Sequence, residues 1–229
     1  MTIEVAAHDA FKKLVDIWKP IAGGRLIIPF CTPIIERPDV LVIGQNHASF
    51  TGNNADLPNN DPIGLEMSEG IPKVNTFIEH NHKFASEVGK FANELSTHVS
   101  SKWCGTNACA IQAEGTDFGK NIYSNPLYDE IRKDSAKILR ALIREHIQPK
   151  NIFLFGKPAI EIYENYFKEI GKGIIHTAPY KDIHLKNENN IRLFALWYPY
   201  GKPIPTSSGS KTRIEINKER IRNGELLIK

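Results

Sequence analysis

Cysteine is scarce in this chain of 229 residues, which has three: Cys31, Cys104 and Cys109. A small, odd number of cysteines provides no disulfide framework. The spacing of Cys104 and Cys109 does not match a zinc site, and no neighbouring Cys or His pair completes one. We therefore expect three buried, inert thiols and no metal or other cofactor.

Long apolar runs are absent as well. No stretch approaches the roughly 18–20 consecutive apolar residues that a membrane-spanning helix needs. The first residues, Met-Thr-Ile-Glu-Val-Ala-Ala-His-Asp, lack the basic and apolar regions of a secretory signal. These absences predict no membrane partner and a cytoplasmic location.

A strong charge of one sign is missing too, because the net charge is only +3. The charge is unevenly placed, however. The segment from Lys202 to Lys229 has seven Lys and Arg against three acidic residues, whereas the preceding residues nearly balance. This segment is either a solvated tail or a surface that meets phosphates.

Short apolar segments alternate with amphipathic ones along the chain. The expected helices are 5–19, 74–98, about 126–146 (with Asn125 as N-cap), 157–170 and 217–222; the expected strands are 40–43, 105–112, 151–155, 174–176 and 191–197, with a short extended piece at 26–30. Segments 51–70 and 206–213 have loop composition. This alternation predicts an α/β fold, a three-layer α/β/α sandwich around a mainly parallel four-stranded sheet.

Polar residues follow two of the expected strands where each strand ends. Val40–Ile43 continues into Gly44-Gln45-Asn46-His47, and Arg192–Trp197 continues into Tyr198-Pro199-Tyr200. Open α/β sheets bind ligands outside the carboxyl ends of their strands. We therefore expect one site built from both strand exits.

Three segments resemble motifs of the uracil-DNA glycosylase superfamily. Gly44-Gln45-Asn46-His47-Ala48 is similar to its first motif, Thr106-Asn107-Ala108 to its second-strand motif, and Gln148-Pro149 through Gly156-Lys157-Pro158-Ala159 to its helix–Pro–strand–Gly-x-x-Ala stretch. Trp197-Tyr198-Pro199-Tyr200 falls where the His-Pro-Ser motif of the family is expected. The resemblance implies a single domain over 1–229, with a core at about 38–205 and a basic C-terminal extension at 206–229.

The chain departs from the family at four positions. His47 stands in place of a Pro, Ala48 in place of the Tyr that excludes thymine, Tyr198 in place of the motif-two His, and Tyr200 in place of its Ser. The four cysteines that hold an iron–sulfur cluster in some branches are also missing. The fold is therefore carried over more safely than the activity.

The resemblance implies catalytic roles for three residues. Asn46 would orient the attacking water, because an amide cannot take its proton; its alternative role is to cap a turn. Tyr198 would donate a hydrogen bond to the departing base, or it is a packing aromatic in a protein that has lost the activity. His47 is a weaker candidate that could supply the missing imidazole.

The same resemblance implies contacts to a flipped base and to the DNA backbone. Asn107 would recognise the base edge with its amide donor and acceptor, or bond backbone at a bulge. Gln45 and Phe50 would also contact the base, Phe50 by stacking. The expected backbone contacts are Lys157, Lys202, Ser207, Ser208 and Lys211.

The sequence thus predicts a monomeric DNA glycosylase that removes a deaminated or mispaired base, uracil above all, from damaged or single-stranded DNA. Two alternatives stay open. One is a relative that binds nucleic acid without cleaving it, which the substitutions at 47, 198 and 200 favour. The other is a protein whose crevice binds a free nucleobase or nucleoside.

Overall fold

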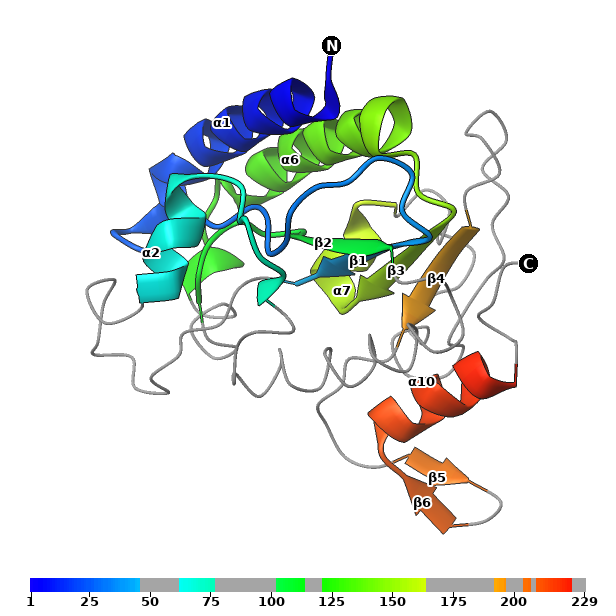
Figure 1. The fold of residues 1–229 in the computed structure, drawn as a ribbon. Coiled ribbons are helices and arrows are strands. Elements are labelled where there is room, and N and C mark those ends of the chain that lie inside the picture. Colours follow the sequence, from blue (N-terminus) through cyan, green and yellow to red (C-terminus); the bar gives the residue numbers. More distant parts are fainter. Residues whose placement is uncertain are drawn as a thin grey trace.

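A computed structural model describes residues 1–45, 62–76, 102–113, 121–163, 192–196, 204–206 and 209–223. Within these ranges the chain folds around four parallel strands, β1 (Val40–Gly44), β2 (Trp103–Asn107), β3 (Asn151–Phe155) and β4 (Arg192–Leu196). They lie in the order β2-β1-β3-β4 (Figure 1). The predicted α/β class with a parallel sheet is therefore confirmed.

The central strands are apolar because both faces of a parallel sheet are covered. All five residues of β1 are buried, as are all five of β3. Leu41 and Ile43 of β1 belong to the main hydrophobic core, together with Ile152 and Leu154 of β3. Side chains alternate along a strand, so Val42 and Phe153 point to the other face, where they are fully buried too.

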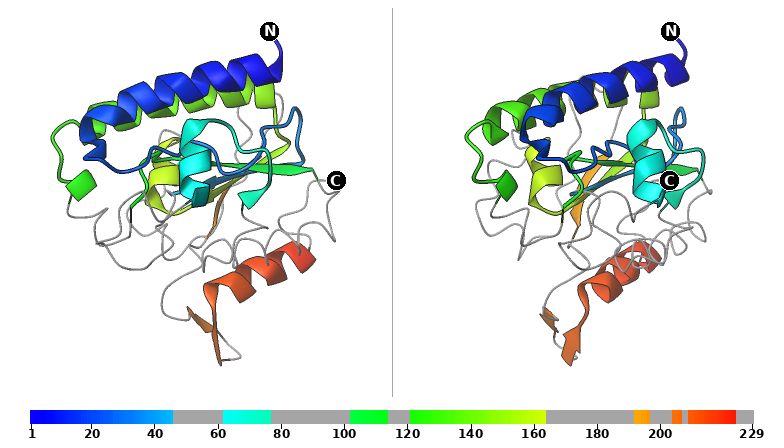
Figure 2. Two further views of the ribbon diagram at one scale, coloured as in Figure 1. Left: turned by 60° about the vertical axis from the view of Figure 1, so that its left-hand side comes forward. Right: turned by 90° about the vertical axis from the view of Figure 1, so that its left-hand side faces the viewer.

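Two long helices cover one face of the sheet. Helix α1 (Ile3–Ala22) and helix α6 (Tyr128–Leu142) lie side by side there (Figure 1), and the views of Figure 2 show the same pairing. Buried residues of α1 belong to the main core. The hydrophobic core is therefore wider than the predicted 38–205, because α1 supplies part of its covering layer.

The ends of α1 follow ordinary capping rules. The Thr2 hydroxyl accepts a hydrogen bond from the backbone N–H of Val5 at 3.4 Å, and Gly23 ends the helix with φ +59°. The first predicted helix, 5–19, is thus confirmed and extends by a few residues at each end.

Helix α6 starts later than the sequence predicted. Its N-cap position is Leu127, and the Asn125 side chain instead accepts a hydrogen bond from the backbone N–H of Leu127, at 3.0 Å, in the turn before the helix. At its other end α6 continues as a π-helical turn, η3 (Ile143–Ile147), which Gln148 closes with φ +50° just before Pro149.

The other predicted elements have mixed outcomes. Strand 151–155 is confirmed, and so is strand 191–197, as β4. Segment 62–69 was expected to be loop but forms helix α2 (Pro62–Glu69), with a proline suited to a first helical turn. The predicted strand 105–112 is wrong in its bounds, since β2 covers Trp103–Asn107. Residues beyond Thr76 of helix 74–98, beyond Tyr163 of helix 157–170, and strand 174–176 lie outside the described ranges.

The C-terminal segment forms a small hairpin and a helix. Strands β5 (Ile204–Thr206) and β6 (Gly209–Lys211) pair antiparallel, and helix α10 (Arg213–Arg222) follows on the side of the sheet away from α1 and α6 (Figure 1). The loop prediction for 206–213 is therefore wrong at β6. Thr212 and Glu215 form a capping box, since the Glu215 carboxylate accepts the backbone N–H of Thr212 at 2.7 Å, so α10 begins before 217.

Candidate functional site

The carboxyl ends of β1 and β2 meet at one edge of the sheet. In the register of this parallel pair, Gly44 lies opposite Asn107. The chain after β2 then crosses the end of β1, because the backbone N–H groups of Ala108 and Cys109 donate to the carbonyls of Gly44 (2.9 Å) and Gln45 (2.8 Å). Two segments more than sixty residues apart in sequence are therefore held against each other.

The strand order marks this edge as a ligand-binding position. From β1 the chain moves to β2 on one side and later to β3 on the other, so the sheet changes direction beside β1. Ligands of open α/β proteins bind outside the strand ends at such a point. Gly44 and Gln45 follow β1 there, and Gly156 follows β3.

Asn107 is the predicted site residue that the structure describes most fully. Its side chain is only 3% exposed, and its amide nitrogen donates to the carbonyl of Ile28 at 2.9 Å. Its backbone N–H donates to the carbonyl of Pro29 at 2.9 Å. The sequence analysis expected Asn107 at the end of a strand, and it occupies the last position of β2.

Of the other predicted contacts, Gln45 is half-buried at the same edge as Asn107. Lys157 is the first residue of helix α7 (Lys157–Glu161), directly after β3. Lys211 lies instead on β6, where its ammonium group pairs with the Glu219 carboxylate at 2.5 Å, which offsets the charge offered to a phosphate. Predicted residues outside the described ranges are Asn46, His47, Phe50, Tyr198, Lys202, Ser207 and Ser208.

The three cysteines are free and buried, as predicted. Burial raises the pKa of the Cys31 and Cys104 thiols to about 12, and raises the pKa of Cys109 still further. Within the described ranges, no three His, Cys, Asp or Glu side chains gather into a group that could hold a metal ion. No helix of those ranges is long and apolar enough to cross a bilayer.

The raised thiol pKa values predict a loss of stability in alkali. The native protein keeps its thiol protons between about pH 9 and 12, whereas the unfolded chain releases them, so the stabilisation present below pH 9 is lost as the pH rises. Each thiol contributes up to about 1.4 kcal/mol per pH unit. Urea unfolding of the wild type and Cys104→Ala at several pH values above 9 should show a shallower decline for the variant; equal slopes would contradict the assignment.

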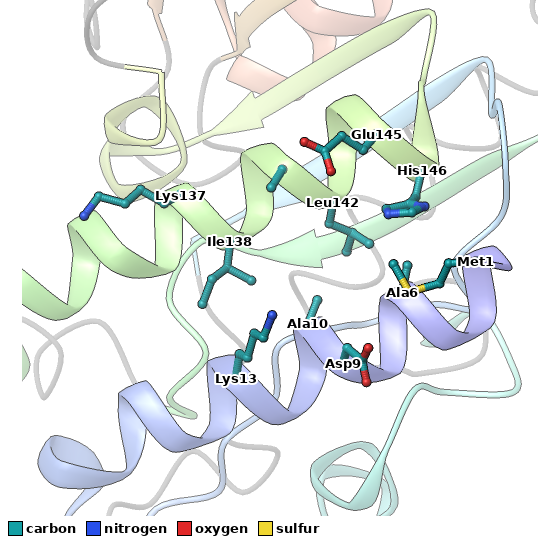
Figure 3. Close-up of a pocket in the computed structure, with 11 residues that line it drawn as sticks. Met1, Ala6, Asp9, Ala10, Lys13, Lys137, Ile138, Leu142, Glu145 and His146 are labelled. Carbon is teal, nitrogen blue, oxygen red and sulfur yellow. The ribbon is translucent and has the colours of Figure 1, made fainter.

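A separate cavity of about 310 Å³ lies between α1 and α6, on the outer side of the helical layer (Figure 3). Its floor is apolar, with Ala6, Ala10 and Leu142, and Lys13 and Ile138 point into the space between the helices. None of the predicted site residues lines it. The cavity is thus distinct from the sheet edge at Gly44 and Asn107.

A cluster of polar aromatic side chains was not singled out in the sequence. Tyr123 and Tyr128 meet edge to face with ring centroids 4.8 Å apart, and Trp18 lies 6.2 Å from Tyr128. Nearby, Arg132 pairs with Glu161 at 3.8 Å and so ties α6 to α7. Aromatic residues at 123 and 128 were the only sequence signal for this cluster, and they equally suit a plain core.

The chain matches no model of a known protein family and no curated protein. The assignment of a function therefore rests on the residues at the edge of the sheet and on the motifs that the sequence carries.

Proposed function

We propose that this chain is a uracil-DNA glycosylase-like hydrolase that cleaves the N-glycosidic bond of a deaminated or mispaired base in DNA, uracil being the first candidate. One observation carries the proposal. Gly44-Gln45 and Asn107, which belong to two separate motifs of the resemblance, are neighbours at the carboxyl edge of the sheet. A glycosylase needs residues from both motifs around one base.

The finer architecture belongs to the same proposal. We propose a three-layer α/β/α sandwich with a four-stranded sheet as its middle layer. Two observations support it: α1 and α6 cover one face, and Val42 and Phe153, which point to the opposite face, are fully buried.

The absence of a side chain on Gly44 suits a base-binding crevice. Gly44 is the register partner of Asn107, so no side chain from β1 stands beside the Asn107 amide at this level of the sheet. A glycine at such a position lets a ligand approach the backbone closely. The crevice would hold a flat ring between the ends of β1 and β2.

The reaction assigns separate tasks to the site residues. As the glycosidic bond breaks, positive charge develops on the sugar and negative charge on the departing base. In this proposal Asn46, the residue after Gln45, orients water toward the sugar, and Tyr198 donates to the departing base. Gln45, Phe50 and Asn107 hold the base, while the lysines and serines of the DNA-backbone set bind phosphates. The scheme uses no metal or cofactor.

The proposal is tested by release of uracil from a single-stranded or mismatched oligonucleotide. Asn46→Ala should lower the rate about 10²–10³-fold, the usual cost of removing one well-placed polar group from a catalytic site. Asn53→Ala, in the polar segment that follows, is the matched control and should retain activity. Equal release by the wild type and Asn46→Ala would remove Asn46 from the mechanism, and absence of release from every deaminated base would reject the activity.

A second candidate function is binding of nucleic acid or a free nucleobase without cleavage. The engagement of the Asn107 amide nitrogen by Ile28 favours it, because that hydrogen is not offered to a base. A non-cleaving relative should bind DNA with strong salt dependence and release no base. Gain of base release in Tyr198→His would count against this alternative.

A further inference from the structure

The Asn107 amide is held from one side by the chain segment that precedes β1. Residues 26–32 run antiparallel along β2 and its extension, with isolated bridges between Phe30 and Thr106 and between Ile27 and Ile111. The Thr106 hydroxyl donates to the carbonyl of Pro29 at 2.7 Å. This segment therefore covers the outer edge of β2 and is fixed in place beside Asn107.

The nitrogen of the Asn107 amide faces that segment. It donates to the Ile28 carbonyl at 2.9 Å. Oxygen and nitrogen diverge from the same amide carbon, so Oδ1 is turned away from Ile28. Among the described residues, no hydrogen bond reaches Oδ1, although the side chain is 3% exposed. A nearly buried acceptor without a donor is costly unless a ligand satisfies it.

Cys31 holds the same amide from a second position. Its thiol is 2% exposed, and the Asn107 side chain hydrogen-bonds to it. Burial raises the pKa of this thiol, whereas the bond to Asn107 lowers it, which requires an amide N–H that donates to sulfur. Thr76 in turn donates its backbone N–H to the Cys31 carbonyl at 3.1 Å and anchors the residue.

We propose that Cys31 is a positioning residue which, with the Ile28 carbonyl, turns the Asn107 amide so that only its oxygen faces the ligand. The inference rests on the proposed function and deepens it. Sequence reasoning allowed Asn107 to offer both a donor and an acceptor, whereas the structure commits its N–H groups to Ile28 and Cys31. The site then selects a ring that presents an N–H to Oδ1, which is the chemistry of a lactam or cyclic imide.

This arrangement excludes rings that present a lone pair at the same place. The N3–H of uracil would satisfy the buried oxygen. The unprotonated N3 of cytosine would set a lone pair against it and leave two buried acceptors facing each other. Selection between these rings thus depends on an amide that does not flip, and Cys31 and Ile28 are what prevent the flip.

The probes for the test are 1-methyluracil and its isomer 3-methyluracil, with affinities measured by titration calorimetry on the full chain. The methyl group at N1 mimics attachment to a sugar and leaves N3–H free, whereas methylation at N3 removes the donor. We expect the wild type to bind 1-methyluracil at least about tenfold more tightly, as expected for one lost hydrogen bond to a buried group. Equal affinities, or binding of neither isomer, would overturn the inference.

Variants at Cys31 test the positioning role itself. Cys31→Ala leaves the amide free on one side, so the preference for 1-methyluracil should fall at least about threefold. Cys31→Ser keeps an acceptor for the amide N–H and should retain the preference. Cys104→Ala removes an equally buried thiol from β2 and should also retain it. An unchanged preference in a folded Cys31→Ala variant, with folding checked by circular dichroism, would reject the role of Cys31.

The outcome is separable from that of the proposed function. Discrimination between the isomers without release of any base from DNA would leave the Cys31 inference standing and reject the hydrolase. Base release without discrimination would do the reverse.

Discussion

Replacement of Trp18 by alanine should lower the free energy of unfolding by about 3–5 kcal/mol, the range for large-to-small changes of buried aromatic residues. Trp18 is 0% exposed and lies on α1 where that helix crosses α6. Its indole N–H donates to the Ser135 hydroxyl at 3.2 Å, and its ring lies 6.2 Å from that of Tyr128. The variant would lose this packing and leave the buried hydroxyl without its donor.

Urea unfolding followed by circular dichroism measures this effect. Trp18→Phe keeps an aromatic ring but no N–H, so it should cost less than alanine, and the difference reports the lost area and cavity. Lys19→Ala, on the exposed neighbour, should change stability by no more than about 0.5 kcal/mol. A loss below about 1 kcal/mol for Trp18→Ala would mean that α1 is not firmly packed on α6.

Gly156→Ala should cost about 1–3 kcal/mol of stability and also lower base release. Gly156 joins β3 to α7 with φ +87° and ψ 167°, a backbone conformation that is essentially restricted to glycine. An alanine there forces the turn to change. Because this turn lies at the carboxyl edge of the sheet, the change should displace the wall of the proposed crevice.

Gly70→Ala is the matched control. Gly70 does not have a positive φ, and no atom lies within 4 Å of a Cβ built on it. Its replacement should be neutral or slightly stabilising, because alanine reduces the entropy of the unfolded chain. Unfolding and base-release assays on both variants check the prediction. Equal behaviour of the two variants would show that the Gly156 turn can relax without cost.

Much of the central sheet was predictable because its signals are local. Val40–Ile43 and Asn151–Phe155 are short apolar runs bounded by polar residues or glycine, and both form buried strands. Helix α1 was predicted from apolar residues at helical spacing. Two of the misses had local signals as well: Pro62 at the start of α2, and the Thr212–Glu215 capping box at α10.

The end of β2 was not predictable from local signals. Residues 108–112 are as small and apolar as those before them, so the pattern continued the strand to 112. The strand ends at Asn107 because Ala108 and Cys109 turn their N–H groups to the carbonyls of Gly44 and Gln45. Those partners lie on another strand, and only the folded chain brings them within reach.

The sequence by itself determined the class of fold, the burial of the thiols and the two chain segments, at Gly44-Gln45 and Asn107, that supply the candidate site. These properties follow from residue type and from periodicity over a few positions. The tertiary structure alone decided which atom of Asn107 is available, because the Ile28 carbonyl and the Cys31 thiol lie more than seventy residues away in sequence. An amide has no preferred direction of its own; the partners that surround it choose one.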